Sequence, residues 1–147
     1  MQKRLLAVLI LVITALALNA CSAPEPAELV DYANVCDQAN DDKRISAIGY
    51  FDPGVSVYCS DSGGDYRCGM DFLETPDAAE GFTADMLEGS GANQMAKLPD
   101  SYSDADIKIQ TNDGGTIGIG QKARISGEML IGEGVCLMSV DRVDPAD

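Results

Sequence analysis

The sequence predicts a mainly β domain with one N-terminal helix, a short helical insertion and two disulfides. The first observation is the stretch 55–72, in which two runs of alternating residues flank Gly63-Gly64, a pattern typical of a two-residue hairpin. The second is the run 122–131, where apolar residues and glycine alternate with mostly polar residues. The third is the presence of four cysteines after the N-terminal segment, because an even number in an exported chain is typical of a disulfide framework.

The N-terminus has the three parts of a secretory signal. Two basic residues follow Met1, residues 5–18 are almost entirely apolar, and small residues come next. An apolar run of about fourteen residues is shorter than the roughly 20 that a permanent membrane helix needs. We therefore expect the segment to be cleaved rather than kept as a membrane anchor.

The four residues Leu18-Asn19-Ala20-Cys21 resemble the lipobox of bacterial lipoproteins. The resemblance implies that residues 1–20 are removed as a signal peptide and that Cys21 is lipidated, which would hold the chain to a membrane through acyl chains. Ser22 replaces the aspartate that retains Gram-negative lipoproteins at the inner membrane. The expected location is therefore the cell envelope and, for a Gram-negative source, the periplasmic face of the outer membrane. The alternative is an ordinary signal peptide.

The mature chain is strongly acidic. Removal of residues 1–20 takes away Lys3 and Arg4 but no acid, which leaves 8 basic and 24 acidic side chains and a net charge of −16. Nucleic acids are held mainly by Lys and Arg contacts to phosphate, so this charge predicts that the chain does not bind nucleic acid. It favours a cationic protein or glycan as partner, although solubility alone is a sufficient reason for the charge.

The hairpin register pairs two of the cysteines. With a turn at Gly63-Gly64, Cys59 lies opposite Cys68 in a non-hydrogen-bonded pair. The Cα atoms of such a pair are about 4.5 Å apart, which fits a disulfide. The same register places two further apolar pairs on this face, Val57 with Met70 and Val55 with Phe72.

Pairing Cys59 with Cys68 leaves Cys36 to pair with Cys136. This second disulfide would join the segment before the first strand to the last strand and close a loop of about 100 residues. A zinc site is the competing use of four cysteines, but the chain has no histidine and no Cys-x-x-Cys. Two disulfides are therefore the expected arrangement.

Before the hairpin, the sequence predicts a tether, a helix and a strand. Two prolines favour an extended tether over residues 21–27. A short helix is expected next, because Leu29, Ala33 and Cys36 share one face at helical spacing. Residues 44–51 then alternate as the first strand.

After the hairpin, the sequence predicts a helical insertion followed by strands. Residues 75–106 are rich in Asp, Ala, Gly and Ser, and Ala79, Phe82 and Met86 have the spacing of one or two short helices. Residues 112–115, Asn-Asp-Gly-Gly, favour a second hairpin. The expected strands are 107–110, 116–119, 122–131 and 135–140.

Residues 28–143 resemble the OB-fold domains of the tRNA-anticodon-binding-like type found in bacterial envelope proteins. The most similar parts are Arg-Ile-Ser-Ala-Ile-Gly-Tyr at 44–50 and Gly-Gln-Lys-Ala-Arg-Ile-Ser-Gly at 120–127, where glycine permits the sharp bends of a small barrel. The resemblance implies a small closed or partly open antiparallel barrel over residues 28–147, of a type that binds ligands in many members. The alternative is another small disulfide-linked barrel or sandwich.

The sequence contains no recognisable catalytic constellation. The lack of histidine excludes Ser-His-Asp and Cys-His arrangements, and oxidised cysteines offer no thiolate. The pair Asp61 and Asp65 and the run Asn112-Asp113-Gly114 suggest calcium, but neither belongs to an EF-hand loop. We therefore expect no catalytic residue, metal or cofactor. An enzyme that uses carboxylates or a metal is an alternative without a coherent site.

The outer side of the first hairpin is the candidate ligand face. The register places Tyr58, Arg67 and Asp71 there, on the face that OB-folds tend to use. The expected function is that of a membrane-anchored envelope lipoprotein acting as a non-enzymatic binding or envelope-maintenance module. The alternative is a periplasmic inhibitor or partner-binding module for a cationic protein such as a lysozyme.

Overall fold

The computed structural model describes residues 24–147. The predicted signal peptide and the predicted lipid attachment at Cys21 lie outside the described residues. Within residues 24–147, no helix combines the length and the apolar character needed to cross a membrane.

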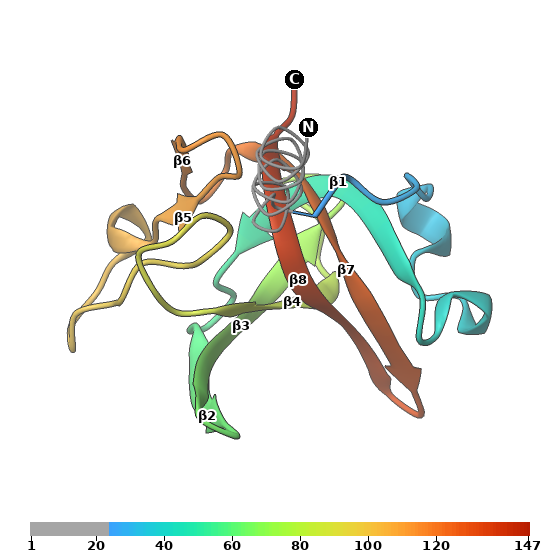
Figure 1. The fold of residues 1–147 in the computed structure, drawn as a ribbon, viewed down its shortest axis with the longest axis horizontal. Coiled ribbons are helices and arrows are strands. Elements are labelled where there is room, and N and C mark those ends of the chain that lie inside the picture. The colour runs from blue at the N-terminus through green and yellow to red at the C-terminus, as the bar shows by residue number, and fades with distance from the viewer. Residues whose placement is uncertain (1–23) are drawn as a thin grey trace, which may run out of the picture.

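The described chain is mainly β, as predicted (Figure 1). Helical residues in residues 24–147 occur only in three short 3-10 turns, η1 (Tyr32–Asn34), η2 (Gln38–Asn40) and η3 (Asp104–Asp106). The strands are β1 (Arg44–Asp52), β2 (Tyr58–Ser62), β3 (Asp65–Leu73), β4 (Phe82–Leu87), β5 (Ile109–Gln110), β6 (Thr116–Ile117), β7 (Lys122–Gly132) and β8 (Val135–Pro145).

Six of the strands form one sheet that closes on itself. Their order is β1-β7-β8-β4-β3-β2, and β1 also pairs with β3, so five strands make a ring and β2 remains at an edge. The pairing of β4 with β8 is parallel, and the other pairings are antiparallel. The short strands β5 and β6 form a separate hairpin, as the Asn-Asp-Gly-Gly run predicts. The inward side chains of the ring form the hydrophobic core.

The ring closes where β1 leaves β7 and joins β3. Residues up to Tyr50 pair with β7, and from Tyr50 onward β1 pairs with β3. Gly49 stands at this transition, where a Cβ atom would lie only 2.3 Å from the carbonyl oxygen of Leu73. A residue without a side chain is therefore required for β1 and β3 to approach this closely.

Both predicted disulfides are present. Cys59 lies opposite Cys68 in the ladder between β2 and β3, with their Cα atoms 4.0 Å apart. Cys36 and Cys136 join the segment after η1 to the start of β8 across 100 residues of sequence. The hairpin turn at Gly63-Gly64 therefore has the predicted register.

The outer part of the predicted hairpin is wrong. Phe72 does not pair with Val55, because Phe51 of β1 takes that place in the ladder. Val57 precedes β2 and donates its N–H to the hydroxyl of Tyr102 at 2.8 Å, so it forms no ladder pair with Met70. The physical reason is competition between strands, since β1 covers the end of β3 and leaves Val55 fully exposed in a loop.

The predicted helical insertion is also wrong. Residues 82–87 form strand β4, in which Phe82, Ala84 and Met86 are buried and the residues between them are partly exposed. β4 has β3 on one side and β8 on the other, and these ladders satisfy its backbone more fully than a short isolated helix would. The apolar period here is two, and the near-helical spacing that began at Ala79 was coincidental.

The predicted N-terminal helix is not shown. Leu29 forms a parallel β-bridge with Ser46, and η1 is a single 3-10 turn in which no residue is buried. Val35, directly after η1, is the fully buried residue of this segment. Pairing with β1 therefore takes the place of the predicted helical turn at Leu29.

Candidate functional site

The candidate site is the outer side of the sheet formed by β2, β3, β4, β8 and β7. Along β3, Cys68, Met70 and Phe72 are buried in the core, so Arg67 and Asp71 point to the opposite side. β2, which carries the exposed Tyr58, continues this surface at one rim, and the hairpin end of β7 and β8 forms the other rim (Figure 1). We call this surface the outer face. Its residues used below are Tyr58, Arg67, Asp71, Thr83, Asp85, Glu128, Leu130, Leu137 and Ser139.

The outer face brings the three predicted residues onto one surface but into different hollows. Tyr58 and Asp71 line a cavity of about 370 Å³ beside the loop 53–56. Tyr58 and Arg67 line a second cavity of about 260 Å³. Tyr58 therefore stands between two hollows, with Arg67 in one and Asp71 in the other.

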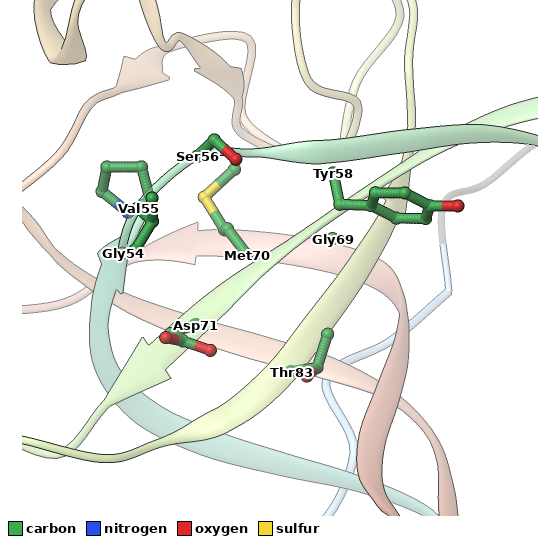
Figure 2. A pocket seen from close by; sticks show the side chains of 9 residues that line it. Gly54, Val55, Ser56, Tyr58, Gly69, Met70, Asp71 and Thr83 are labelled. Atoms are coloured by element: carbon green, nitrogen blue, oxygen red, sulfur yellow. The ribbon is translucent and has the colours of Figure 1, made fainter.

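Gly69 lines the cavity beside the loop 53–56 and presents no side chain to it. In Figure 2 the ring of Tyr58 lies on one side of Gly69, and Thr83 and the carboxylate of Asp71 lie on the other. Tyr58 is 74% exposed, which leaves its ring available for stacking. This arrangement combines an apolar surface, a hydroxyl and one negative charge.

Arg67 is held by a network of hydrogen bonds within the protein. Its Nε donates to the carboxylate of Asp85, and its Nη2 donates to the Asp85 carbonyl oxygen and to Ser139 Oγ, both at 2.9 Å. The side chains of Arg67 and Asp85 are only 19% and 23% exposed, so the pair is shielded from solvent. Arg67 therefore links β3, β4 and β8 through hydrogen bonds, and the carboxylate of Asp85 compensates its positive charge.

With Arg67 neutralised, the outer face is acidic. The ion pairs within residues 24–147 are Arg67–Asp85 and two that involve Asp141 and Asp144. Asp71 beside the first cavity and Glu128 in the hollow between Arg67 and the β7–β8 rim take part in none of these pairs. Leu130 and Leu137 add apolar surface to that hollow, which measures about 440 Å³. The face thus offers apolar and negatively charged contacts.

The carboxylates that suggested a calcium site accept hydrogen bonds from backbone N–H groups within turns. Asp61 Oδ1 accepts the N–H of Gly64 at 3.0 Å, and Asp113 Oδ1 accepts the N–H of Gly115 at 3.0 Å. Within residues 24–147, one group of three potential metal ligands lies within 4.8 Å, Cys59, Cys68 and Glu88. Because the two cysteines are joined in a disulfide, they have no thiolate to offer a metal.

Sequence reasoning missed the part of the site that β4 and β8 supply. Thr83 and Asp85 pair with Leu137 and Ser139 across the parallel ladder, more than 50 residues away in the chain. The period-two burial of β4 was the available signal for Thr83 and Asp85, but it competed with the apparent helical spacing. Nothing local in the sequence indicated that β8 would be the neighbour of β4.

The N-terminal segment is bound at the far end of β8 from the hairpin rim. Three arginine side chains donate to backbone carbonyl oxygens of residues 24–27, and Ser46 Oγ donates to one of them as well. The predicted tether is therefore attached to the sheet over these four residues. The arginine bonds are Arg44 to Glu25 (2.9 Å), Arg124 to Ala27 (2.6 Å) and Arg142 to Pro24 (2.8 Å).

Comparison of the chain with protein-family models, with curated proteins and with solved structures found no match. The functional argument therefore depends on the geometry and charge of this chain.

Proposed function

We propose that this protein is a lipid-anchored envelope lipoprotein whose domain is a non-enzymatic binding module of the OB type. The signal-like N-terminus and the lipobox-like residues before Cys21 support the anchor. The closed ring supports the OB assignment. With β1, β3, β4, β7 and β8 counted as its first to fifth strands, the order around the ring is first, second, third, fifth and fourth, a Greek-key arrangement.

The observation that carries the binding function is the position of the outer face. OB-folds bind ligands on the face of their second and third strands, between the loops that flank it. In this chain those strands are β3 and β4, and the face lies between the β2–β3 hairpin and the β7–β8 turn. The exposed ring of Tyr58 and the two neighbouring cavities lie on this face.

A cationic protein is the partner that the charge of the face favours. Asp71 and Glu128 lie on the face without an ion-pair partner among residues 24–147, whereas Arg67 is neutralised by Asp85. The whole chain has 24 acidic and 10 basic side chains, so its field attracts positive partners from a distance. This supports the second candidate function, an inhibitor or partner-binding module for a cationic protein.

The bound N-terminal segment supports an outward orientation of the site. Pro24, held by Arg142 near the end of β8, is three residues after Cys21. Val135 at the hairpin rim is seven residues from Arg142 along β8, or roughly 23 Å at the rise of a strand. A lipid at Cys21 would therefore hold one end of the barrel near the membrane and leave the rim of the outer face pointing away.

The anchor is tested by metabolic labelling with palmitate. Wild type should take up label and fractionate with membranes, whereas Cys21→Ala should do neither. Cys136→Ala with Cys36→Ala is the matched control, since it removes cysteines at sites that the proposal does not lipidate. Equal labelling of wild type and Cys21→Ala would contradict the anchor.

The binding function is tested by pull-down from an envelope extract with the full-length protein in detergent. We expect capture of a basic protein that weakens as salt rises, because attraction between exposed charges is screened over about 8 Å at physiological ionic strength. Tyr58→Ala and Asp71→Asn should reduce capture. Asp104→Asn is the matched control, because it removes a charge from η3, which lines none of the three hollows of the outer face. Capture that is insensitive to the outer-face variants would place the binding surface elsewhere.

A further inference from the structure

β2 is an open edge of the sheet. It pairs with β3 alone, and the hairpin turn makes Ser62–Asp65 and Ser60–Arg67 hydrogen-bonded pairs. The alternate residues, Cys59 and Asp61, therefore direct their backbone N–H and C=O groups away from β3. None of the hydrogen bonds outside the strand ladders of residues 24–147 uses these four backbone groups. These two donors and two acceptors form a row that can hydrogen-bond to another strand.

A cavity lies beside this edge on the opposite side from the outer face. It measures about 460 Å³, and Cys59, Leu98 and Tyr102 supply its apolar wall. The hydroxyl of Tyr102 accepts the N–H of Val57 just before β2, so the free row of edge groups begins at Cys59. Because Cys59 belongs both to the cavity wall and to the free row, the cavity adjoins the free edge.

A strand added to β2 would use both sides of the hairpin. Side chains alternate across a strand, so one set would lie over this cavity beside Cys59 and Asp61. The other set would lie over the outer face, beside Tyr58 and Ser60. Backbone hydrogen bonds at the edge would supply affinity, and the two hollows would select alternate side chains.

The charge around the edge identifies the kind of strand. Asp61 stands on the edge, and Glu88 and Asp100 line the cavity against the single basic residue Lys97. A second copy of this chain is disfavoured as the occupant, because pairing β2 with β2 would bring two chains of net charge −14 together. A segment that carries lysine or arginine would be attracted to the same position.

We propose that β2 accepts an extended, lysine- or arginine-bearing segment of a partner protein as an added strand. The inference rests on the proposed function, a binding module for a cationic protein, and supplies its mode of binding. The partner contributes alternating basic and apolar side chains. The basic ones lie on the cavity side, near Asp61, Glu88 and Asp100, and the apolar ones lie over the outer face beside Tyr58.

The probe is a synthetic peptide with the repeating sequence Lys-Val, capped at both ends. Its binding to the full-length, isotope-labelled protein in non-ionic detergent is followed by the amide signals in NMR spectra at low salt. Two control peptides share its length. One has Glu in place of Lys, and the other carries N-methyl groups on the backbone nitrogens of alternate residues.

We expect the largest signal changes at the amides of Cys59 and Asp61. The N-methylated peptide should bind at least about tenfold more weakly, a loss of about 1.4 kcal/mol, because it lacks the edge hydrogen bonds. The Glu peptide should not bind. Asp61→Pro, which removes one edge N–H, should bind at least about tenfold more weakly than Asp61→Ala. Both variants lose the carboxylate that accepts the N–H of Gly64. The difference between their affinities for the peptide therefore measures the contribution of the edge N–H alone.

Two results would overturn the strand-addition proposal. Equal binding of the N-methylated and unmodified Lys peptides, with signal changes confined to Asp71 and Thr83, would mean docking on the outer face without an added strand. Absence of binding by the Lys peptide up to about 1 mM would exclude the edge as a site for basic strands. The pull-down of a basic protein is unaffected by either result and tests the proposed function separately. If Asp61→Pro does not fold, the peptide pair with wild type decides the question.

Discussion

Replacing Gly49 by alanine tests whether the ring closes as tightly as its geometry requires. The added Cβ would lie 2.3 Å from the carbonyl oxygen of Leu73 and 2.7 Å from Cε1 of Phe72, whereas ordinary contact begins at 3.4 Å. The carbonyl is backbone, and the fully buried Phe72 ring packs 5.0 Å from Phe51 and 5.4 Å from Phe82 between centroids. Neither atom can move aside, so β1 and β3 must separate by about 1 Å.

The expected cost of Gly49→Ala is about 2 to 3 kcal/mol of unfolding free energy. Overpacking a well-filled core costs typically about 1 to 3 kcal/mol, and a clash with backbone belongs at the upper end. Alanine also restricts the unfolded chain, which returns about 0.4 to 1 kcal/mol at a position that tolerates it. The measurement is urea unfolding of the purified protein, followed by circular dichroism and analysed by linear extrapolation.

Gly132→Ala is the matched control. Gly132 ends β7, has nothing within 4 Å of the position of an added Cβ, and has no positive φ. We expect this variant to equal wild type or to exceed it by less than about 1 kcal/mol. If Gly49→Ala unfolded within about 0.5 kcal/mol of Gly132→Ala, the reasoning from the close approach of β1 and β3 would be refuted.

Three further outcomes are expected. Replacing Cys36 and Cys136 by alanine should lower the unfolding free energy by about 4 to 5 kcal/mol, because the disulfide closes a 100-residue separation; equal urea midpoints would contradict this. The N–H and hydroxyl of Ser103 hold the pKa of Asp106 below its ordinary value, so this carboxylate should stabilise the fold above the pKa of the unfolded chain and lose that effect as pH falls through the lower folded pKa. NMR titration measures that pKa, and acid unfolding of Asp106→Asn should lack this pH dependence. Labelled oligonucleotides at about 50 mM salt should bind no more tightly than millimolar, because Arg67 is already paired with Asp85, and micromolar affinity would show that the charge argument fails.

Turns and cysteines made the first hairpin predictable. Gly63-Gly64 has positive φ at both residues, which is the geometry that a two-residue hairpin turn requires. Once that turn is set, the period of two aligns Cys59 with Cys68, and Cys36 is left for Cys136. The first pairing thus follows from a few residues that are close together in the sequence, and the second follows by elimination.

The wrong predictions concern positions where two strands could pair with the same partner strand, or where the apolar spacing fits both a helix and a strand. Phe72 could pair with Val55 by continuing the hairpin, but β1 returned to take that position through Phe51. Phe82 and Met86 fit a helical face, and they fit alternate positions of a strand equally well. Local pattern alone does not decide between such options, because burial against distant segments determines which is more stable.

By itself, the sequence determined the β class, the turn and register near Gly63-Gly64, both disulfides and the placement of Tyr58, Arg67 and Asp71 on one side of the hairpin. Only the tertiary structure decided that β1 closes onto β3 and that β4 lies parallel to β8, which completes the outer face. The physical reason is that every strand offers the same backbone donors and acceptors. The choice of a distant neighbour therefore depends on the apolar surface that the whole ring buries, which no single segment encodes.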